Sequence, residues 1–571
     1  MMATAHRATR ASTLQDFKPL SPAEQIVLRA ARTGDIATLG YRRPRDANPA
    51  VGVRGAFLAF LALGGGEGAR VHGPQLQVVG ARIVGRIDLA CARVPMGLWL
   101  YRCTLGSAPV LDGARISGSV SFSGCSLPAL HAQACQIDGD LSLNARCKVE
   151  GEVMLAHAHV RQNLNLAHLR DGNPDAPLAQ RIVANGVRVG GDVILDEAEI
   201  VGESCFLSAR ILGDFRAVAA RLTADLDESG SRGVALRLDR ARIGGSVRLN
   251  DGFSAAGQVS LRRTRIDSDL DCCGALFDAA GDVSWGEFGS PLVLDRARVG
   301  GSLILRKLQS PLQGASLADA RVRSLLDDGA TWGQHHVLDG FAYQRFAGSA
   351  ATDSATRLAW LTRQSSTHLG NDFRPEPWRR LIRVLRRMGR EPSAREVAIG
   401  REQHMRRAGL IGRGAPLGAR WLVQLAHAFF GGFAGYGYRP LRLVATAGAL
   451  WLLCSGAYWA AAEQGALAPS AALSAANPRL ESCLPECDLL PKTAPRFQPF
   501  IYSIEMLVPL IDLQQRRHWA PVRNATAGDV EQWTGVSPLL ALTWFEGLCG
   551  WIVTLTLFAM LTGLTDRDRR R

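Results

Sequence analysis

A short segment in which apolar and polar residues alternate recurs along the first half of the chain. ARIGGSVRL at residues 241–249 returns as ARVGGSLIL at 297–305, VRVGGDVIL at 187–195 and ARISGSVSF at 114–122. Alternation with a period of two is typical of a strand that is buried on one face. Ile83 and Val94, which hold the same place in two copies, are 11 residues apart, and other copies recur near multiples of that interval. Such a rhythm predicts a parallel β-solenoid with roughly 22 residues per coil.

The glycines and the flanking segments define where this solenoid should begin and end. Gly244 and Gly245 lie at a predicted corner, where a residue without Cβ is needed. We expect a right-handed solenoid over residues 71–330, with about 11 to 12 coils. Residues 1–70 should form a helical cap over the first coil, because Ser21 and Glu24 make a capping box with Pro22 at the first helical position.

The period changes to that of a helix after the repeats. Residues 375–389 carry an apolar stripe that includes Trp378, and residues 393–407 open on Ser393 with Glu396 three residues later. Two amphipathic helices joined by a turn predict a tetratricopeptide-like hairpin within a helical region at 331–435. A single hairpin cannot bury its own apolar face, so we expect it to pack on the last coil or on the membrane-proximal segment.

Two long uncharged runs follow, at residues 443–462 and 547–564. Each has the length of a transmembrane helix, and they predict a two-span membrane region at 436–571. Arg439 and Arg442 precede the first run and an arginine cluster follows the second, which places both flanks in the cytoplasm. The solenoid and both termini would then be cytoplasmic, and the loop between the spans would lie outside. Cys483 and Cys487 fall in that loop, where a disulfide and free thiols are both open interpretations.

A third apolar stretch, FIYSIEMLVPLIDL at residues 500–513, is too short to span and is typical of a re-entrant or interfacial segment. The order of span, short segment and span is similar to the pore domain of two-span potassium channels. The candidate pore-like residues are Tyr502, Ser503, Glu505, Pro509 and Asp512. The filter glycines of such channels are missing and Pro509 stands among these residues, so potassium selectivity is not expected and a non-conducting derivative remains an alternative.

The whole arrangement resembles a family of uncharacterised bacterial membrane-anchored proteins with pentapeptide-repeat-like β-helices. The resemblance rests on the AR[IV]xG coils, on PWRRLIRVLRRMGREPSAREVAIGREQ, and on FIYSIEMLVPLIDLQQRRHWAP with the closing GWIVTLTLFAMLTGL. It implies a solenoid held at the bacterial inner membrane. Some members carry the label "membrane-associated oxidoreductase", which implies no particular cofactor or catalytic residue here.

Residues that could carry catalysis or bind a metal have a plainer explanation in the repeat. The glycine pairs lie between strands, no phosphate-binding loop motif occurs, and Cys272 and Cys273 are adjacent rather than spaced as C-x-x-C. Asp239 and Asp295 hold equivalent places in two copies, which favours a role in the coil over catalysis. No catalytic residue, cofactor site or metal site is therefore assigned.

The formal net charge is +14, and almost all of the basic residues are arginine. A stripe of arginines could bind nucleic acid or acidic lipid, but a solvated charged face is the simpler interpretation and no nucleic-acid partner is expected. The stripe comprises Arg237, Arg240, Arg242, Arg248, Arg262, Arg263 and Arg265.

The sequence thus favours a membrane-anchored scaffold or interaction protein without a catalytic site. Its expected partners are the lipid bilayer and either another protein or further copies of itself. An ion-channel-like pore or signalling module, with the solenoid as sensor, is the first alternative. A membrane-associated oxidoreductase is the second.

Overall fold

The computed structural model of the 571-residue chain describes residues 13–44, 49–171, 180–225, 232–278, 290–370, 372–414, 416–469, 496–521 and 537–562. The chain divides into two compact units, Met1–Val397 and Ala398–Arg571. The first unit contains all of the parallel strands, and the second contains the two long apolar helices.

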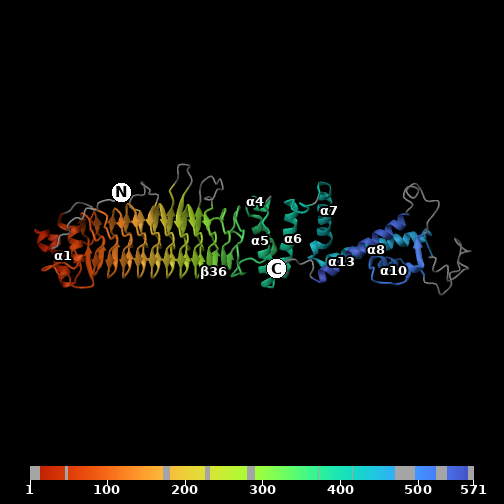
Figure 1. The fold of residues 1–571 in the computed structure, drawn as a ribbon, viewed down its shortest axis with the longest axis horizontal. Helices are drawn as coiled ribbons and strands as arrows, with labels where there is room; N and C mark the ends of the chain where they lie inside the picture. Colours follow the sequence, from red (N-terminus) through yellow and green to blue (C-terminus); the bar gives the residue numbers. More distant parts are fainter. Residues whose placement is uncertain are drawn as a thin grey trace, which may run out of the picture. The chain divides into compact units, whose positions relative to one another are not determined.

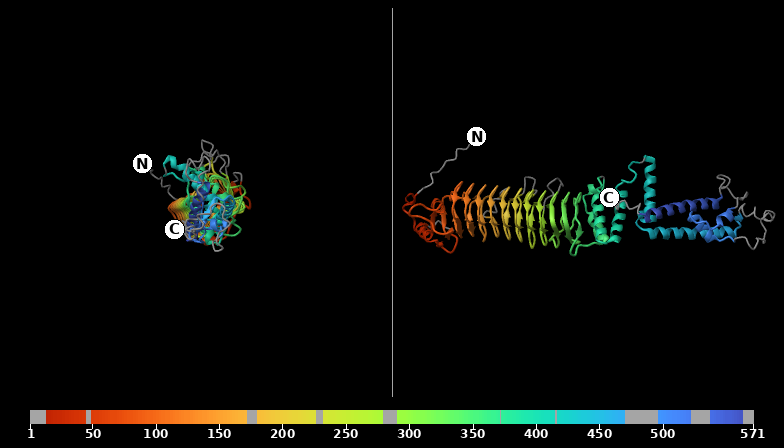
Figure 2. Two further views of the ribbon diagram at one scale, coloured as in Figure 1. Left: turned by 90° about the vertical axis from the view of Figure 1, so that its right-hand side faces the viewer. Right: turned by 60° about the horizontal axis from the view of Figure 1, so that its bottom comes forward.

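The parallel strands of the first unit stack in four columns, and each strand pairs in register with its counterpart one coil further along (Figure 1). One coil runs from β12 (Gln136–Ile137) through β13 (Leu141–Ser142), β14 (Lys148–Val149) and β15 (Val153–Met154) to β16 (His159–Val160). The side view in Figure 2 shows the successive coils lying parallel. This arrangement confirms the predicted parallel, solenoid-like architecture.

The strands are grouped by column as follows. Column 1 contains β5 (Arg93–Val94), β8 (Arg115–Ile116), β12, β16, β20 (Arg188–Val189), β24 (Arg210–Ile211), β28 (Arg242–Ile243), β32 (Arg265–Ile266), β36 (Arg298–Leu305) and β37 (Arg321–Asp327). Column 2 contains β1 (Ala37–Thr38), β3 (Gln75–Val79), β6 (Gly97–Tyr101), β9 (Val120–Ser123), β13, β17 (Leu164–Asn165), β21 (Val193–Ile194), β25 (Phe215–Arg216), β29 (Val247–Arg248), β33 (Leu270–Asp271), β36, β37 and β38 (Arg345–Phe346). Column 3 contains β2 (Gly52–Arg54), β4 (Arg82–Val84), β7 (Thr104–Leu105), β10 (Ser126–Leu127), β14, β18 (Arg170–Asp171), β22 (Glu199–Val201), β26 (Arg221–Thr223), β30 (Ser254–Ala256) and β34 (Leu276–Asp278). Column 4 contains β11 (Leu130–His131), β15, β19 (Gln180–Val183), β23 (Glu203–Cys205), β27 (Val234–Arg237), β31 (Gln258–Ser260) and β35 (Leu292–Val293).

Apolar side chains fill the inside of every coil. Ile243 pairs with Ile211 on one side and with Ile266 on the other, and each of the three is at most 2% exposed. Their neighbours in the AR[IV] motif point the opposite way, as alternation along a strand requires. The stack therefore buries a continuous line of branched aliphatic residues along its axis.

A file of short polar side chains links the coils at the corner between columns 1 and 2. Asp192 Oδ1 accepts a hydrogen bond from the backbone N–H of Asp214 at 2.7 Å, and Asp214 Oδ1 accepts one from the N–H of Ser246 at 2.8 Å. A Cβ on Gly245 would lie 2.0 Å from Asp214 Oδ1. The glycine of the motif is therefore required, as predicted, although the reason is the close approach of the preceding coil and its φ is not positive. The same linkage recurs in the file Ser119, Asp140, Asn163, Asp192, Asp214, Ser246, Asp269 and Ser302.

The predicted capping box at Ser21 forms, but the strands begin earlier than residue 71. α1 (Pro22–Thr33) starts at a capping box in which Ser21 and Glu24 bond reciprocally. Buried Glu24 also pairs with Arg54 at 2.7 Å. α1 contacts β1, β2 and β3, and α2 (Gly55–Ala62) contacts β2. The short strands β1 and β2 lack the repeated motif, which is why the sequence pattern did not reveal them.

The C-terminal end of the stack is closed around a buried ion pair. Both terminal nitrogens of Arg357 bond the Asp327 carboxylate at 2.7 Å, and each side chain is only 2% exposed. Trp332 Nε1 donates to the same carboxylate at 2.7 Å, and the Arg357 guanidinium lies 3.7 Å from the Phe346 ring centroid. Arg357 belongs to α3 (Ser354–Thr362). Parallel pairing continues to β38, so the solenoid extends past the predicted end at residue 330.

The helices after the solenoid are α4 (Ser366–Leu369), α5 (Glu376–Arg387) and α6 (Glu391–Arg407). α5 contacts β38, so of the two expected places of packing, the last coil and the membrane-proximal segment, this helix contacts the end of the solenoid. The predicted capping box at Ser393 is wrong, because α6 begins two residues earlier and encloses Ser393.

The second unit contains α7 (Leu417–Ala434), α8 (Pro440–Glu463), α10 (Pro499–Leu507), α11 (Gln515–His518) and α13 (Pro538–Leu561), with the antiparallel strands β39 (Leu467–Pro469) and β40 (Trp519–Pro521). α8, α10 and α13 contact one another. α13 starts at Pro538, nine residues before the predicted run at 547–564, and Ser537 is its N-cap. The uncharged-run criterion missed this start because Glu546, a charged residue type, lies within the helix and is fully buried.

Candidate binding surface on the solenoid

The arginine of the AR[IV] motif forms an exposed file along column 1. Six consecutive coils place an arginine at the same register position, and every one of these side chains is exposed. They are Arg188, Arg210, Arg242, Arg265, Arg298 and Arg321. Arg93 and Arg115 hold the same position nearer the N-terminal end, with Gln136 and His159 between the two groups. We call the six consecutive residues the arginine file.

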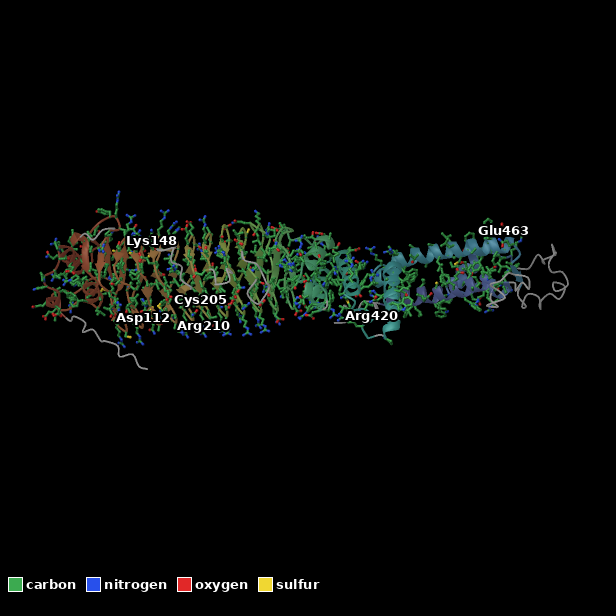
Figure 3. The ribbon with its side chains drawn as sticks, turned by 90° about the horizontal axis from the view of Figure 1, so that it is seen from above. Asp112, Lys148, Cys205, Arg210, Arg420 and Glu463 are labelled. Atoms are coloured by element: carbon green, nitrogen blue, oxygen red, sulfur yellow. The ribbon has the colours of Figure 1, made fainter. Side chains whose placement is uncertain are left out.

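The arginine file is a line of like charges with little internal compensation. Coils about 4.8 Å apart give it a length of about 24 Å. Arg265 pairs with Asp267 at 3.0 Å, but both side chains are more than half exposed. Among the described residues, the other five form no ion pair. Two unit charges 5 Å apart in water repel by roughly 0.8 kcal/mol, so an anionic partner would relieve a repulsion that the fold itself does not. Figure 3 labels Arg210 on the edge of the solenoid where nitrogen-tipped side chains project outward.

A groove of about 1060 Å³ lies beside the C-terminal end of the arginine file. It follows the corner between columns 4 and 1, where Arg240, Arg263 and Arg296 stand two residues before arginines of the file. Its lining also includes Asp239 and Asp295. The groove therefore offers cationic donors and carboxylate acceptors side by side.

The groove carboxylates bond to the next coil, as the repeat suggested. Asp239 accepts hydrogen bonds from the Arg262 N–H at 2.8 Å and from Ser260 Oγ at 2.6 Å. Asp295 accepts one from Ser316 Oγ. Each keeps contact with the groove as well, so a ligand there would meet carboxylates already fixed in position.

Three histidines that lie close together in the sequence, His157, His159 and His168, occupy different places in the coils. His157 and His168 occupy corners with positive φ, whereas His159 lies in column 1, and His168 pairs with Glu197 at 3.2 Å. Among the described residues, no group of three potential metal ligands occurs.

His335 and His336 are adjacent in sequence but lie in different environments. His335 lines the groove, whereas His336 is fully buried against the Trp332 ring, with its Nε2 3.1 Å from the Gly333 carbonyl oxygen. Burial lowers the pKa of His336 to about 4, so the buried ring is neutral at pH 7.

The predicted arginine stripe spreads over several surfaces. Arg242 and Arg265 belong to the arginine file, but Arg237 lies in column 4 and Arg248 in column 2, where it pairs with Asp214 at 3.1 Å. Arg240, Arg262 and Arg263 lie at the groove corner. Sequence reasoning grouped them by proximity along the chain, whereas the position of each arginine relative to the buried isoleucine would have separated them.

The pore-like residues also divide into two groups. Tyr502, Ser503 and Glu505 are buried on α10, which is seated between α8 and α13. Pro509 is half-buried, and Asp512 is exposed and pairs with Arg517 at 2.6 Å. Cys483 and Cys487 lie outside the described residues.

Two helices of the second unit, α8 and α13, are long and apolar enough to cross a membrane, judged by length and composition alone. Both expose large apolar side chains, including Leu453 at 74% and Leu548 at 63%. α7 adds Phe429 at 72%. Apolar exposure on this scale is typical of a surface that contacts lipid or another protein.

Comparison with known proteins yields no relative. The chain matches no protein-family model, no curated protein and no solved structure.

Proposed function

We propose that the chain is a membrane-anchored scaffold protein whose solenoid binds an acidic partner protein along the arginine file. The solenoid would be right-handed and cytoplasmic, and α8 and α13 would hold it at the inner face of a bacterial membrane. The observation that carries this proposal is the in-register repetition of exposed, largely unpaired arginines over six coils. The resemblance to membrane-anchored β-helix proteins implies the same architecture.

The chemistry of the surface favours a protein partner over a nucleic acid. Phe206 and Phe215, which flank Arg210 in sequence, are buried in the coil, as are Phe253 and Phe277, and these rings offer no platform for stacked bases. The groove carboxylates could accept hydrogen bonds from the backbone N–H groups of a polypeptide, which a phosphate backbone does not offer. An extended acidic segment of a partner could place its carboxylates against the arginine file and its backbone N–H groups against the groove carboxylates.

The same surface favours a different protein over a second copy of this chain. In the described coils, none of the four columns carries a file of carboxylates that could face the arginine file. Two files of like charge would repel each other. The arginine file is therefore not self-complementary.

Membrane anchoring rests on the apolar exposure of the second unit. The most apolar 18-residue windows of α8 and α13 are only 22% and 17% buried. A core helix of a globular protein would bury most of its length. A bilayer would cover these side chains, and the arginines that flank the helices in sequence favour a cytoplasmic solenoid.

Binding to an acidic peptide tests the proposal. Full-length protein in nanodiscs of neutral lipid would be titrated with a labelled glutamate-rich peptide and followed by fluorescence anisotropy. The test variant combines Arg210→Gln, Arg242→Gln and Arg265→Gln. The matched control removes three charges from column 3 through Arg82→Gln, Lys148→Gln and Arg221→Gln.

We expect the column 1 variant to bind at least about tenfold more weakly than the control, which corresponds to about 1.4 kcal/mol. Equal losses in the two variants would show that only net charge matters. Absence of peptide binding, or tighter binding to duplex DNA than to the peptide, would overturn the proposed partner class.

A second candidate function, a pore or signalling module, is favoured by one observation. α10 packs between α8 and α13, and a Cβ on Gly550 would lie 2.2 Å from the Leu507 carbonyl oxygen. We propose Gly550→Leu as the test, because it would displace α10. A conductance in planar bilayers that this variant abolishes would support a pore, and silence of the wild-type protein over a range of potentials would count against it.

A further inference from the structure

A carboxylic acid in the second unit has no basic partner and no access to water. Glu546 lies in the first half of α13 and is 0% exposed. Among the described residues, it forms no ion pair, and its Oε2 atom has no hydrogen-bond partner. An ionised carboxylate in such a place is strongly disfavoured unless a cation neutralises it.

The hydrogen bonds around Ser503 favour a proton as that cation. Ser503 Oγ contacts two oxygen atoms, Glu546 Oε1 and the carbonyl oxygen of Trp451, the latter at 3.3 Å. A serine hydroxyl has one proton and can donate fully to only one of them. Both contacts are hydrogen bonds at once if Glu546 donates to Ser503 while Ser503 donates to Trp451. A donating Glu546 must carry a proton.

The neighbouring groups supply no alternative counter-charge. Cys454 and Tyr458 from α8 lie beside the Glu546 carboxyl group. Tyr502 from α10 and Cys549 from α13 also face it. Glu505, the buried carboxylate of α10, accepts a hydrogen bond from the Arg516 backbone N–H at 3.0 Å, and the Arg516 guanidinium lies near Tyr502 rather than Glu546. The groups facing Glu546 are thus neutral or acidic.

The cluster has unused polar atoms as well. Tyr458 and Ser455 are 0% exposed; the Tyr458 hydroxyl lies beside the Glu546 carboxyl group, but among the described residues neither it nor Ser455 Oγ forms a hydrogen bond of good geometry. A single carboxylate with hydroxyl neighbours is a poor site for a divalent metal ion, which takes several charged oxygen ligands. A proton requires only one acceptor oxygen.

We infer that Glu546 is a proton-binding site within the helical unit, completed by Ser503, and that it takes up one proton as the unit folds. The inference does not depend on the arginine file or its partner. The inference also bears on the pore alternative, because the Ser503–Glu546 contact joins α10 to α13. Loss of the proton would weaken the packing of α10 against α13.

The test is the pH dependence of thermal unfolding of the full-length protein in nanodiscs. Glu546→Gln keeps the shape and the donor capacity of the protonated acid without titrating. Glu463→Gln, at the exposed end of α8 (Figure 3), is the matched control. The reporter is fluorescence of the second unit, followed between pH 5 and pH 9 in sodium and in choline buffers.

We expect the midpoint of the wild-type protein and of Glu463→Gln to fall as the pH rises, because the unfolded acid ionises while the buried one must hold its proton. Glu546→Gln should lose that decline and be the more stable protein at high pH. An unfolding midpoint that rises with sodium rather than with acid would indicate that the site binds a metal ion. A pH profile of the midpoint that is the same in Glu546→Gln as in the wild-type protein would show that Glu546 is not the proton-binding group. Either result would overturn the inference.

Discussion

The buried Arg357–Asp327 pair provides the sharpest prediction about stability. Asp327→Ala removes two 2.7 Å hydrogen bonds from the guanidinium and the acceptor of the Trp332 indole N–H. An arginine that is 2% exposed is then left without its counter-ion. Loss of one member of a buried pair costs about 3–5 kcal/mol. The entropy of unfolding is about 2.1 cal/mol/K per residue, so a first unit of 397 residues has an unfolding entropy near 0.8 kcal/mol/K. Dividing the lost free energy by this entropy gives a drop of about 4–6 °C in Tm.

Differential scanning fluorimetry of the full-length protein measures this drop, and hydrogen exchange locates it. The surface control is Asp267→Ala, whose pair with Arg265 is mostly exposed and should cost no more than about 1 kcal/mol. In Asp327→Ala, exchange should quicken in the last coils, around residues 321–346, and stay slow in the first coils. An apolar replacement of both partners, Asp327→Leu with Arg357→Met, should recover most of the loss. The reasoning is refuted if Asp327→Ala matches the surface control or if the double variant is as unstable as the single one.

Three further predictions concern the interior of the solenoid. Gly213→Ala should lower the free energy of unfolding by about 1–3 kcal/mol in thermal unfolding, because the added Cβ would lie 2.0 Å from Asp192 Oδ1. The control Gly329→Ala, whose Cβ would have no atom within 4 Å, should leave the free energy of unfolding nearly unchanged. The pKa of His336 is lowered to about 4, so the neutral ring contributes fully to folding stability above pH 6.5. As the pH falls from 6.5 to 4, the free energy of unfolding should decrease by up to about 3 kcal/mol. In acid denaturation, His336→Phe should show a weaker dependence of stability on pH, and an unchanged dependence would contradict the assignment. Burial raises the pKa of Cys147 to about 12, so iodoacetamide should label exposed Cys91 in the folded protein and leave Cys147 unlabelled in peptide mass spectra; comparable labelling of both would contradict this.

The coil interior could be predicted because its information is local and periodic. A buried residue such as Ile243 recurs with its glycines and its arginine, so one copy of the motif specifies strand, corner and direction. The first and last strands escaped prediction because they are held by neighbours distant in sequence, as β1 is by β3. The same holds for Arg357 and Asp327, which are 30 residues apart and carry no periodic signal.

The candidate sites were less accessible to sequence reasoning. Arginines adjacent in the chain were grouped together, although Arg237 and Arg248 lie in different columns from Arg242. Ser503 was noted as part of a pore-like segment, but its contact with Glu546 joins α10 to α13 across 43 residues. Only coordinates bring such pairs together.

Site-specific photo-crosslinking tests the central claim most directly. Leu212 is 73% exposed and stands two residues after Arg210 in the arginine file. A photo-reactive amino acid at this position, in full-length protein in native membranes, should yield an adduct with an acidic protein. The adduct should disappear when Arg210, Arg242 and Arg265 become glutamine and persist when Arg82, Lys148 and Arg221 do. No adduct at residue 212, or one that survives the column 1 substitutions, would contradict the assignment of the arginine file as the binding surface.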